Sequence, residues 1–274
     1  MKKIKLIGLD LDGTLLNDRK ELTPYTEHVL SEAIAKGVHV LAATGRPIGG
    51  IPERIRNFPG MRYAVTANGA RIIDLQEEKI LYEALVEPKN VEKILDVFEC
   101  YDTLKEVYLD GISYVSEKEF ADLPRYVENP AMRQYIRLTK IPVADVRQEM
   151  QKTGKGSDKV HALFADLSER ECALEDLKKI PGVTVSSAIR NNIEVNGGEV
   201  DKGKGLLRLG KILGIEREEI MACGDGLNDV AMLRDAGLGV AMGNASAEVK
   251  AAADVVTCSN EEDGVAKAIE MYVL

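Results

Sequence analysis

The sequence predicts an α/β protein in which a Rossmann-like core with a parallel sheet is interrupted by an inserted α+β domain. Strand and helix patterns alternate near the start of the chain and again near its end, as in parallel sheets with right-handed crossovers. Between these regions the pattern changes to alternating segments and a hairpin signal. The length of 274 residues also exceeds the usual size of one domain. We therefore expect the core at 1–83 and 188–274 and the inserted domain at 84–187.

The first part of the core is predicted from hydrophobic periodicity and a helix-start signal. Thr23 and Pro24 form an N-cap followed by a first-turn proline, which is typical of the start of a helix. The expected elements are, in order, strand 4–9, a helix from 24 to 36, strand 38–43, helix 48–57 and strand 63–67. This order predicts a parallel sheet.

The middle of the chain is predicted to fold differently. Asp110 and Gly111 separate the short apolar segments 106–109 and 112–115, and an Asp-Gly pair in that position signals a tight hairpin. Helix-start signals and an apolar run indicate further elements: a helix from Pro88, a strand at 159–165, and a helix that begins at the capping-box residue Ser168 and runs toward Lys179. This mixture is typical of an α+β domain.

Alternation of strands and helices returns near the end of the chain. The stretch 193–195 is predicted to be the strand that re-enters the core. After it we expect a helix up to Leu213, strand 219–223, helix 228–234, strand 238–242 and helix 245–253. These elements are expected to continue the parallel sheet of the first part.

Composition and charge argue against several classes of partner. The chain has 36 Lys+Arg against 45 Asp+Glu and a net charge of −9, so we expect no nucleic-acid partner, because phosphate-backbone binding needs clustered positive charge. The four cysteines are far apart and form no closely spaced metal or redox pair. No stretch reaches the roughly 18 apolar residues of a membrane span. The cytoplasm is the expected location, and the oligomeric state is left open.

Acidic side chains follow two of the apolar strands. Asp10 and Asp12 stand where strand 4–9 opens into a loop, and Asp225 follows strand 219–223 in the same way. Open α/β sheets bind ligands at the carboxyl ends of their strands. If the two strands are neighbours, the three carboxylates converge, and hard oxygen ligands with open positions suit Mg²⁺, whereas zinc would require His or Cys.

A structural interpretation is open for each motif taken alone. Asp and Asn beside Gly are ordinary turn and N-cap residues at strand-to-helix junctions. A third polar segment, Thr44 to Arg46, ends strand 38–43 in the same manner. Three such segments at three strand ends favour a functional site at that edge of the sheet.

These residues resemble the motifs of the haloacid dehalogenase superfamily, and the resemblance runs through the whole chain. It implies that Asp10 is a nucleophile and Asp12 a general acid/base. The second, third and fourth motifs of the superfamily match Thr44, Lys202, and Asp225 with Asp229. The catalytic residues implied are Asp10, Asp12, Thr44 and Lys202, and the implied Mg²⁺ ligands are Asp10, Asp12, Asp225 and Asp229. For Asp229 the alternative is that it orients Lys202 or a metal-bound water.

The segments 68–70, 241–245 and 259–265, together with the large insertion, are similar to the Cof-type subfamily IIB, whose inserted domain is a C2B cap. The subfamily consists chiefly of sugar-phosphate phosphatases. The resemblance therefore implies a Mg²⁺-dependent phosphatase that hydrolyses small phosphomonoesters, sugar phosphates foremost, through an aspartyl-phosphate intermediate. A small phosphorylated molecule is the expected partner.

Physical chemistry supports these implied roles. A carboxylate with a pKa near 3.9 is ionised at pH 7 and needs no base in order to attack. Its attack on a phosphate dianion must be screened, since each unit-charge pair at about 4 Å is worth roughly 4 kcal/mol near a protein surface. Mg²⁺ and Lys202 would supply this compensation. Asp12, in contrast, must hold a proton for the leaving group.

Contacts to phosphate or substrate are expected from Thr44, Gly45, Arg46, Asn68, Lys202 and Asn228. Two of these have a structural alternative, since Arg46 could be a solvated loop charge and Asn68 a turn residue. His39 and His161 lie inside apolar strand patterns and are expected to be structural. Lys204 is expected to face solvent.

Two rival functions are open. A phosphosugar mutase would use the same aspartyl-phosphate but return the phosphoryl group to a sugar. A non-catalytic regulatory protein would bind a phosphosugar without turnover. The presence of a nucleophile with an acid/base beside it argues against the second rival, because binding alone does not require that pair.

Overall fold

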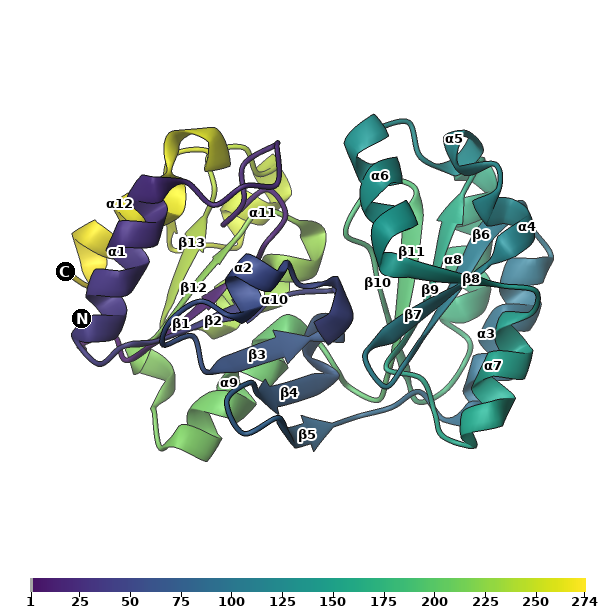
Figure 1. Cartoon of the computed structure of the whole chain (residues 1–274), viewed down its shortest axis with the longest axis horizontal. Helices are drawn as coiled ribbons and strands as arrows, with labels where there is room; N and C mark the ends of the chain where they lie inside the picture. Colours follow the sequence, from purple (N-terminus) through teal and green to yellow (C-terminus); the bar gives the residue numbers. More distant parts are fainter. Residues whose placement is uncertain (1) are drawn as a thin grey trace. The chain divides into compact units, whose positions relative to one another are not determined.

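The chain is described by a computed structural model over residues 2–274 and divides into two compact units (Figure 1). The core unit consists of the residues up to Gly45, Pro52–Tyr82 and Asp201–Leu274. The inserted unit consists of Arg46–Ile51 and Glu83–Val200. Each unit has its own sheet and its own hydrophobic core.

The core unit is built on an eight-stranded sheet in the order β14-β13-β12-β1-β2-β3-β4-β5. Neighbours from β14 to β3 are parallel, and β4 is antiparallel to β3. The strands are β1 (Leu6–Leu9), β2 (His39–Ala43), β3 (Tyr63–Thr66), β4 (Arg71–Asp74), β5 (Lys79–Glu83), β12 (Ile220–Gly224), β13 (Leu238–Ala241) and β14 (Val255–Val256). The prediction of a Rossmann-like α/β fold is confirmed.

Helices cover the core sheet and bury its apolar side chains. Leu206 and Leu209 of α9 pack with Leu6 and Leu41 of the central strands. Helices α1 and α12 pack against each other and lie side by side in Figure 1. The helices are α1 (Pro24–Ala35), α2 (Glu53–Arg56), α9 (Lys202–Leu213), α10 (Val230–Asp235), α11 (Ala247–Ala251) and α12 (Gly264–Tyr272), and the short 3₁₀ turns are η2 (Ala67–Gly69), η3 (Arg217–Glu219), η4 (Leu227–Asp229) and η5 (Asn260–Glu262).

Two helix predictions in the core have different outcomes. Helix α1 begins as expected, because the Thr23 side chain accepts a hydrogen bond from Thr26 N and Pro24 occupies the first turn. The single helix expected at 48–57 is wrong: the chain forms a 3₁₀ turn, η1 (Ile48–Gly50), and the short helix α2. Pro52 lies between them with ψ 136°, and proline also disfavours a helical conformation in the residue before it.

The inserted unit has a six-stranded, mostly antiparallel sheet in the order β10-β11-β9-β6-β7-β8. Its strands are β6 (Thr103–Leu109), β7 (Ile112–Ser116), β8 (Lys140–Val143), β9 (Lys159–Phe164), β10 (Val183–Ser186) and β11 (Asn192–Gly197). Its helices are α3 (Pro88–Glu99), α4 (Glu117–Phe120), α5 (Leu123–Tyr126), α6 (Pro130–Thr139), α7 (Val146–Thr153) and α8 (Leu167–Leu177). One apolar cluster joins this sheet to α3, α7 and α8, and a second joins it to α5 and α6.

Two local predictions in the inserted unit, a hairpin and a helix N-cap, have different outcomes. The hairpin between β6 and β7 is present, and its two turn residues have positive φ, 49° at Asp110 and 80° at Gly111, as a type I′ turn requires. The expected N-cap of α8 at Ser168 is wrong. The cap is Asp166, whose carboxylate accepts hydrogen bonds from the backbone N–H groups of Ser168 and Glu169.

The expected domain boundary at 187/188 needs correction. Strand β11, predicted to re-enter the core, pairs antiparallel with both β9 and β10, and the inserted unit continues to Val200. The short segment Arg46–Ile51 also belongs to the inserted unit. The residues of β11 alternate between polar and apolar from Asn192 to Asn196, but the strand is buried along its whole length, so this alternation does not mark a sheet with one exposed face.

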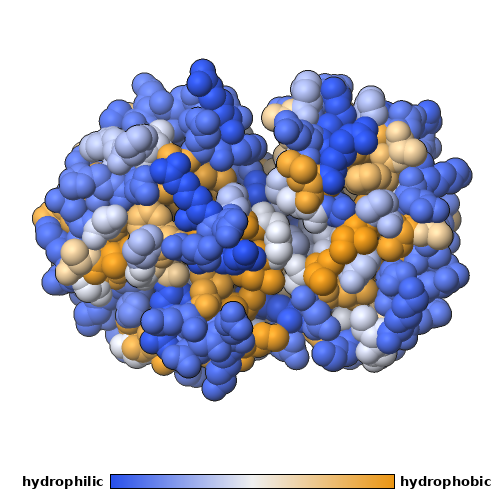
Figure 2. Space-filling model, viewed as in Figure 1, coloured by the Kyte–Doolittle hydropathy of each residue, from blue (hydrophilic) through white to orange (hydrophobic). Residues whose placement is uncertain are grey.

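Hydrophilic residues cover most of the visible face of each unit in Figure 2. Within residues 2–274, no helix has both the length and the apolar character that crossing a bilayer requires.

Candidate active site

The site lies in the core unit at the carboxyl ends of adjacent strands. Strand β1 pairs with β12 on one side and with β2 on the other, so the residues that follow these three strands meet at one edge of the sheet. Asp10 follows β1 directly, and its backbone N–H donates to the Cys223 carbonyl of β12 at 3.0 Å. This bond fixes the start of the acidic loop to the neighbouring strand.

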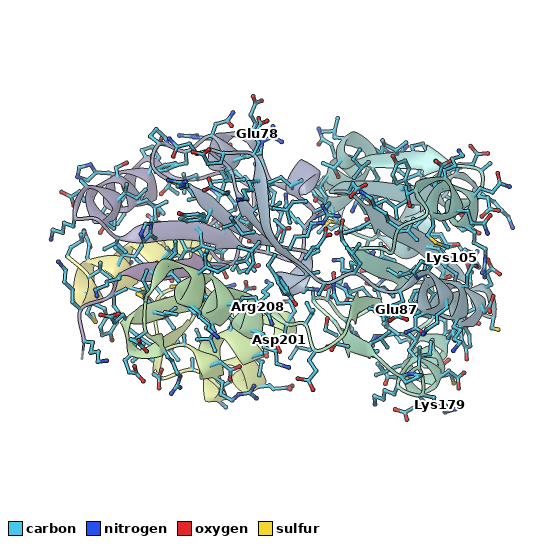
Figure 3. The ribbon with its side chains drawn as sticks, turned by 90° about the horizontal axis from the view of Figure 1, so that it is seen from below. Glu78, Glu87, Lys105, Lys179, Asp201 and Arg208 are labelled. Carbon is cyan, nitrogen blue, oxygen red and sulfur yellow. The ribbon has the colours of Figure 1, made fainter. Side chains whose placement is uncertain are left out.

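Lys202 connects two of the carboxylates. Its side chain is fully buried at the first turn of α9, and its Nζ donates to Asp10 Oδ1 and to Asp229 Oδ1, both at 2.6 Å. The helix begins at Asp201, whose side chain accepts from the backbone N–H of Lys204. Figure 3 shows Asp201 at the start of this helix and Arg208 farther along it. The N-cap therefore sets the position from which the lysine reaches the acids.

Asp229 serves as a support for Lys202 and for the turn after β12. Its Oδ1 accepts from Lys202, while its Oδ2 accepts from the backbone N–H groups of Asp225 and Gly226 at 3.0 and 2.9 Å. Its side chain is 1% exposed. Both oxygens are thus engaged by the protein, which makes Asp229 an orienting group for the lysine.

Asp225 is held by residues that the sequence reasoning missed. Its Oδ1 accepts from Thr14 Oγ1 at 2.7 Å, and its Oδ2 lies 3.4 Å from Asn244 Nδ2. Gly13 has φ of 81°, and a Cβ at that position would lie 2.4 Å from Asp225 Oδ2. Glycine is therefore required at position 13 for two reasons: the positive φ, and the Asp225 carboxylate, which leaves no room for a side chain. The sequence signal was available, since Thr14 directly follows the Asp-x-Asp-Gly stretch.

Asp12 stands slightly apart from this group. One oxygen each of Asp10, Asp225 and Asp229 lies within 4.8 Å of the other two, and Asp12 is not part of that cluster. The Asp12 carboxylate is about one-third exposed, and it pairs with Lys20 Nζ at 2.7 Å. The structure thus separates a buried acidic cluster from a more accessible carboxylate on the same loop.

The polar residues expected to contact phosphate surround the end of β2. Thr44 is buried directly after β2, and its backbone N–H donates to the Val65 carbonyl at 2.8 Å. Asn68 N–H donates to the Thr44 carbonyl at 3.1 Å, and Asn228 Nδ2 donates to Asn68 Oδ1 at 3.2 Å. Gly45 follows Thr44 at the limit of the core unit. Four of the predicted residues therefore come from the same set of connected loops.

The turn that carries Asn68 is tightly constrained. Ala67 and Asn68 both have positive φ, 48° and 58°, which is uncommon for residues with a side chain. At Gly69 an added Cβ would lie 2.3 Å from the Asp201 carbonyl oxygen, at the start of α9. The turn with Asn68 and the helix with Lys202 are thus in direct backbone contact.

Arg46, which follows Gly45, lies outside the core unit. It belongs to the inserted unit, where its Nη1 donates to the Gly50 carbonyl at 2.7 Å and its guanidinium lies 4.2 Å from the centre of the Tyr135 ring. The side chain is 8% exposed. Of the residues singled out as structural, His161 is buried in the inserted unit and Lys204 is partly exposed on α9.

The electrostatics of the cluster reflect crowded negative charge. Burial raises the pKa of Asp10 to about 8, and Asp229, Asp225 and Asp12 add to this rise while Lys202 opposes it. Burial also raises the pKa of Asp225 to about 6, against the hydrogen bond from Thr14. Burial alone would lower the pKa of Lys202, but Asp10 and Asp229 outweigh it and keep the ammonium charged. Three carboxylates therefore share one buried positive charge.

This arrangement has the composition of a magnesium site. The carboxylate oxygens of Asp10 and Asp225 are hard donors, and a divalent cation beside them would favour their ionised forms against the burial and the neighbouring carboxylates that raise both pKa values. The same cation and Lys202 would attract a phosphate group to the end of β1. The donor set thus fits Mg²⁺ and is suited to phosphoryl transfer.

Comparison with known proteins places these features in a family. The model of the haloacid dehalogenase-like hydrolases matches residues 7–269. A 5-amino-6-(5-phospho-D-ribitylamino)uracil phosphatase of Bacillus subtilis, YcsE, is 33% identical over 99% of this chain and 96% of its own length. The pyridoxal phosphate phosphatase YbhA of Escherichia coli is 29% identical over 98% of this chain and 99% of its own length.

Solved structures give the same result. A haloacid dehalogenase-like hydrolase from B. subtilis has a TM-score of 0.86 and 29% identity, over 99% of this chain and 100% of that chain. The sugar phosphatase BT4131, of haloacid dehalogenase subclass IIB, has a TM-score of 0.82 and 26% identity, over 98% of both chains. Phosphatases thus recur among both kinds of relative.

Proposed function

The chain belongs to the haloacid dehalogenase-like hydrolases and is a phosphoric monoester hydrolase, and from this premise we propose its mechanism and substrates. We propose a Mg²⁺-dependent phosphatase that hydrolyses small phosphomonoesters, sugar phosphates foremost, through an aspartyl-phosphate on Asp10. The observation that carries the proposal is the buried Lys202 ammonium, which bonds Asp10 and Asp229 at 2.6 Å each beside Asp225.

In the first half-reaction an Asp10 oxygen bonds to phosphorus while the bond from phosphorus to the ester oxygen breaks. Asp12 gives its proton to the departing oxygen, so that an alcohol leaves rather than an alkoxide. Asp12 is suited to this role because it is on the same loop as Asp10 and is partly open to solvent. Its ion pair with Lys20 has to open for the transfer, which the partial exposure of both side chains permits.

In the second half-reaction water hydrolyses the aspartyl-phosphate. Asp12, now ionised, takes a proton from the water as its oxygen bonds to phosphorus. The bond between phosphorus and the Asp10 oxygen breaks, inorganic phosphate leaves, and the Asp10 carboxylate is restored. Asp12 thus acts first as acid and then as base, with no net change in its protonation.

Lys202 lowers the charge repulsion in both steps. Its ammonium is already oriented by Asp229, so no reorganisation is needed when negative charge arrives beside Asp10. Thr44 and Asn228 would donate hydrogen bonds to phosphate oxygens from the ends of β2 and β12. Asn68 would act with Asn228, to which it is hydrogen bonded.

We assign the metal contacts of the core unit to Asp10 and Asp225. Asp229 is less suited, because its Oδ1 accepts from the Lys202 ammonium and its Oδ2 accepts from two backbone N–H groups. The Asp12 carboxylate pairs with Lys20 outside the cluster. When bound, Mg²⁺ would supply a Lewis acid that neutralises charge on the transferring phosphoryl group. Thr14 and Asn244 would hold Asp225 in place.

The substrate class is proposed from the relatives. Subclass IIB includes a sugar phosphatase, and other relatives are phosphatases of a phosphoribitylamino-uracil and of pyridoxal phosphate. All of these compounds are small molecules. We therefore expect a substrate of that size, with a sugar or sugar-alcohol phosphate as the first choice.

The proposal is tested by the release of inorganic phosphate from a panel of hexose and pentose phosphates, 5-amino-6-(5-phospho-D-ribitylamino)uracil, pyridoxal phosphate and p-nitrophenyl phosphate. Wild type is assayed with Mg²⁺ and with chelator, beside the Asp10→Asn variant. Metal-dependent release that the variant lacks is the expected result. Transfer of phosphate between sugar positions, dependent on a bisphosphate activator, would indicate a mutase. Binding without either reaction would indicate a regulatory protein.

A further inference from the structure

The turn 259–264 near the end of the chain is a closed unit whose role the proposed mechanism does not explain. Ser259 and Glu262 form a reciprocal capping box around η5, and Gly264 N–H donates to the Ser259 carbonyl at 3.0 Å. At Gly264 an added Cβ would lie 2.1 Å from the Cys258 carbonyl oxygen. The turn is therefore rigid by its own bonds. In Figure 1 this yellow segment lies beside the purple loop that leads from β1 to α1.

Asn260 connects the turn to the loop that follows Asp10. Its side chain is buried, and its Nδ2 donates to the Leu16 carbonyl at 3.2 Å and to Asp18 Oδ1 at 3.1 Å. Glu261 Oε1 accepts from the Asp18 backbone N–H at 2.6 Å. Leu16 in turn forms a backbone bridge with Asp12. A hydrogen-bonded path thus runs from Asn260 to the backbone of the proposed acid/base.

A second path leads from Asn260 to the metal side of the site. The Asn260 backbone N–H donates to Asn244 Oδ1 at 3.1 Å. The Asn244 Nδ2 donates to the Gly13 carbonyl at 2.9 Å and lies 3.4 Å from Asp225 Oδ2. Asn244 is exposed, so packing does not fix it, and these bonds determine its orientation. Asn260 therefore holds the loop on both sides of Thr14.

The far end of the same loop is also tied to the turn. Asp263 has φ of 57°, and its Oδ1 accepts hydrogen bonds from the hydroxyl groups of Thr23 and Thr26, at the start of α1. At Gly243 an added Cβ would lie 2.8 Å from Ser259 N, so the loop with Asn244 and the turn are in backbone contact. Contacts of the turn thus extend along the loop from Gly13 to the first turn of α1.

We propose that the turn 259–264 is a positioning device for residues 11–18, with Asn260 as its central residue, and that it sets the places of Asp12 and Asp225. Asn260 and Asn244 are positioning residues, since they act through the loop and do not touch the reacting atoms. The inference rests on the proposed function for its effect on turnover. Its effects on Mg²⁺ affinity and on loop protection are independent of turnover.

The first test is the Asn260→Ala variant, compared with wild type at 25 °C. Displacing a catalytic group by about 1 Å costs on the order of 100-fold in rate, so we expect kcat to fall by about 10- to 100-fold while KM changes little. Amide hydrogen exchange should become faster in residues 11–18 and remain unchanged in β2 and β3. Asn57→Ala, at an exposed asparagine of the same unit, is the matched control and should behave as wild type.

The second test is the Asn244→Ala variant, which keeps the Asn260 side chain and removes the contacts of Asn244 with Gly13, with Asp225 and with the Asn260 backbone N–H. The affinity for Mg²⁺, measured by isothermal titration calorimetry without substrate, should weaken by about 10-fold, as is typical when the partner of a metal ligand is lost. Because Asn244 is exposed, we expect the Asn244→Ala variant to fold. It therefore still tests the positioning role of the turn if Asn260→Ala does not fold.

The outcomes separate this inference from the proposed function. If wild type releases no phosphate from any ester, the proposed function fails, and calorimetry and hydrogen exchange still decide the role of the turn. If both variants keep wild-type kcat, Mg²⁺ affinity and exchange in residues 11–18, the positioning role is overturned. A lower melting temperature with those three quantities unchanged also overturns it, since the turn would then only stabilise the fold.

Discussion

Both units bury charged side chains, but they balance them differently. In the core unit the carboxylates of Asp10, Asp225 and Asp229 share the single ammonium of Lys202. In the inserted unit Lys159 pairs with Glu194 at 2.6 Å, and Glu106 pairs with Lys140. Crowding raises the pKa of Asp10 and Asp225, whereas pairing holds the pKa of Glu106 well below its usual range.

The network around Glu106 is complete without any ligand. Ser113 and Lys140 donate to Glu106 Oε1, and His161 Nδ1 lies 3.1 Å from Oε2. On the other side of the ring, Asn192 Nδ2 lies 3.3 Å from His161 Nε2. The charges of the network in the inserted unit balance without an added ion, whereas the crowded carboxylates of the core unit would be stabilised by a bound cation.

The strongest test of the unbalanced cluster removes its central carboxylate. Asp10→Asn should lower kcat by at least about 10⁴-fold, because loss of a nucleophile removes the covalent route altogether. The measurement is phosphate release from the best ester of the panel, with a circular dichroism melt to show that the variant is folded. Wild-type turnover in this variant would contradict the mechanism.

Removing the shared positive charge should have the next largest effect. Lys202→Ala should reduce kcat by about 10³-fold, since a preorganised charge beside the transferring group is lost. Three carboxylates would then be left without their buried partner, so the free energy of unfolding should also fall, by about 3 kcal/mol or more. Urea unfolding in the absence of Mg²⁺ measures this loss in the free energy of unfolding.

Lys204→Ala is the matched control for this experiment. Lys204 lies on the same turn of α9, but its side chain is 42% exposed. Its removal should leave both the rate and the unfolding free energy near wild-type values. Equal losses in the two variants would show that the effect belongs to the helix start and not to the buried charge.

For the charge-balanced network around Glu106, the expected effect of a substitution is on stability and not on turnover. Glu106→Gln leaves the buried Lys140 without its anion, which should cost about 3 kcal/mol in the free energy of unfolding. The double variant Glu106→Gln/Lys140→Met should recover part of this loss, because no unpaired charge remains. Urea unfolding of the single and double variants measures the loss and its recovery. A double variant less stable than Glu106→Gln would show that the pair contributes more than charge balance.

The smallest expected effect is a pH dependence of the rise in melting temperature that Mg²⁺ causes. Because burial raises the pKa of Asp225 from 3.8 to about 6, its protonated form is favoured in the folded state, and this contribution to stability is lost as the pH rises from about 4 to about 6. Bound Mg²⁺ favours the ionised form. The rise in melting temperature on adding Mg²⁺ should therefore be greater at pH 7 than at pH 5, by a few degrees. An equal rise in melting temperature at pH 5 and at pH 7 would contradict the assignment of Asp225 as a metal ligand.

Asp225→Asn is the matched variant for the pH experiment. Its amide cannot ionise, so the loss of stability between pH 4 and 6 should be smaller than in wild type. The response to Mg²⁺ should also be weaker at every pH, because one of the proposed ligands is a poorer donor.

Most of the site could be predicted because its chemistry depends on short-range patterns. Asp10, Asp12 and Asp225 follow apolar strands directly, and a parallel order makes the ends of those strands meet. Lys202 depended on the family resemblance, since nothing in its immediate surroundings distinguishes it from Lys204. The structure separates them by burial, and burial is a tertiary property.

What the sequence could not predict depends on contacts between distant residues. Strand β11 pairs with β9 and β10, and the buried ion pair of Glu194 and Lys159 joins side chains that lie 35 residues apart. The roles of Thr14 and Asn244 follow from the place of Asp225, more than 200 residues from Thr14. Pro52, by contrast, is a local signal, because a proline at this position predicts the break that separates η1 from α2.

The order of strands also bears on how the protein is synthesised. Strand β1 pairs with β12, as Leu6 does with Ile220, so the central strand lacks one neighbour until more than 200 further residues have been made. The inserted unit is complete at Val200 and needs no later residue for its sheet. On the ribosome, where domains generally fold as units, it can therefore close first. Asp10 has no contact with Lys202 until α9 has been made, so the buried cluster of the core unit can form only after the inserted unit has been synthesised.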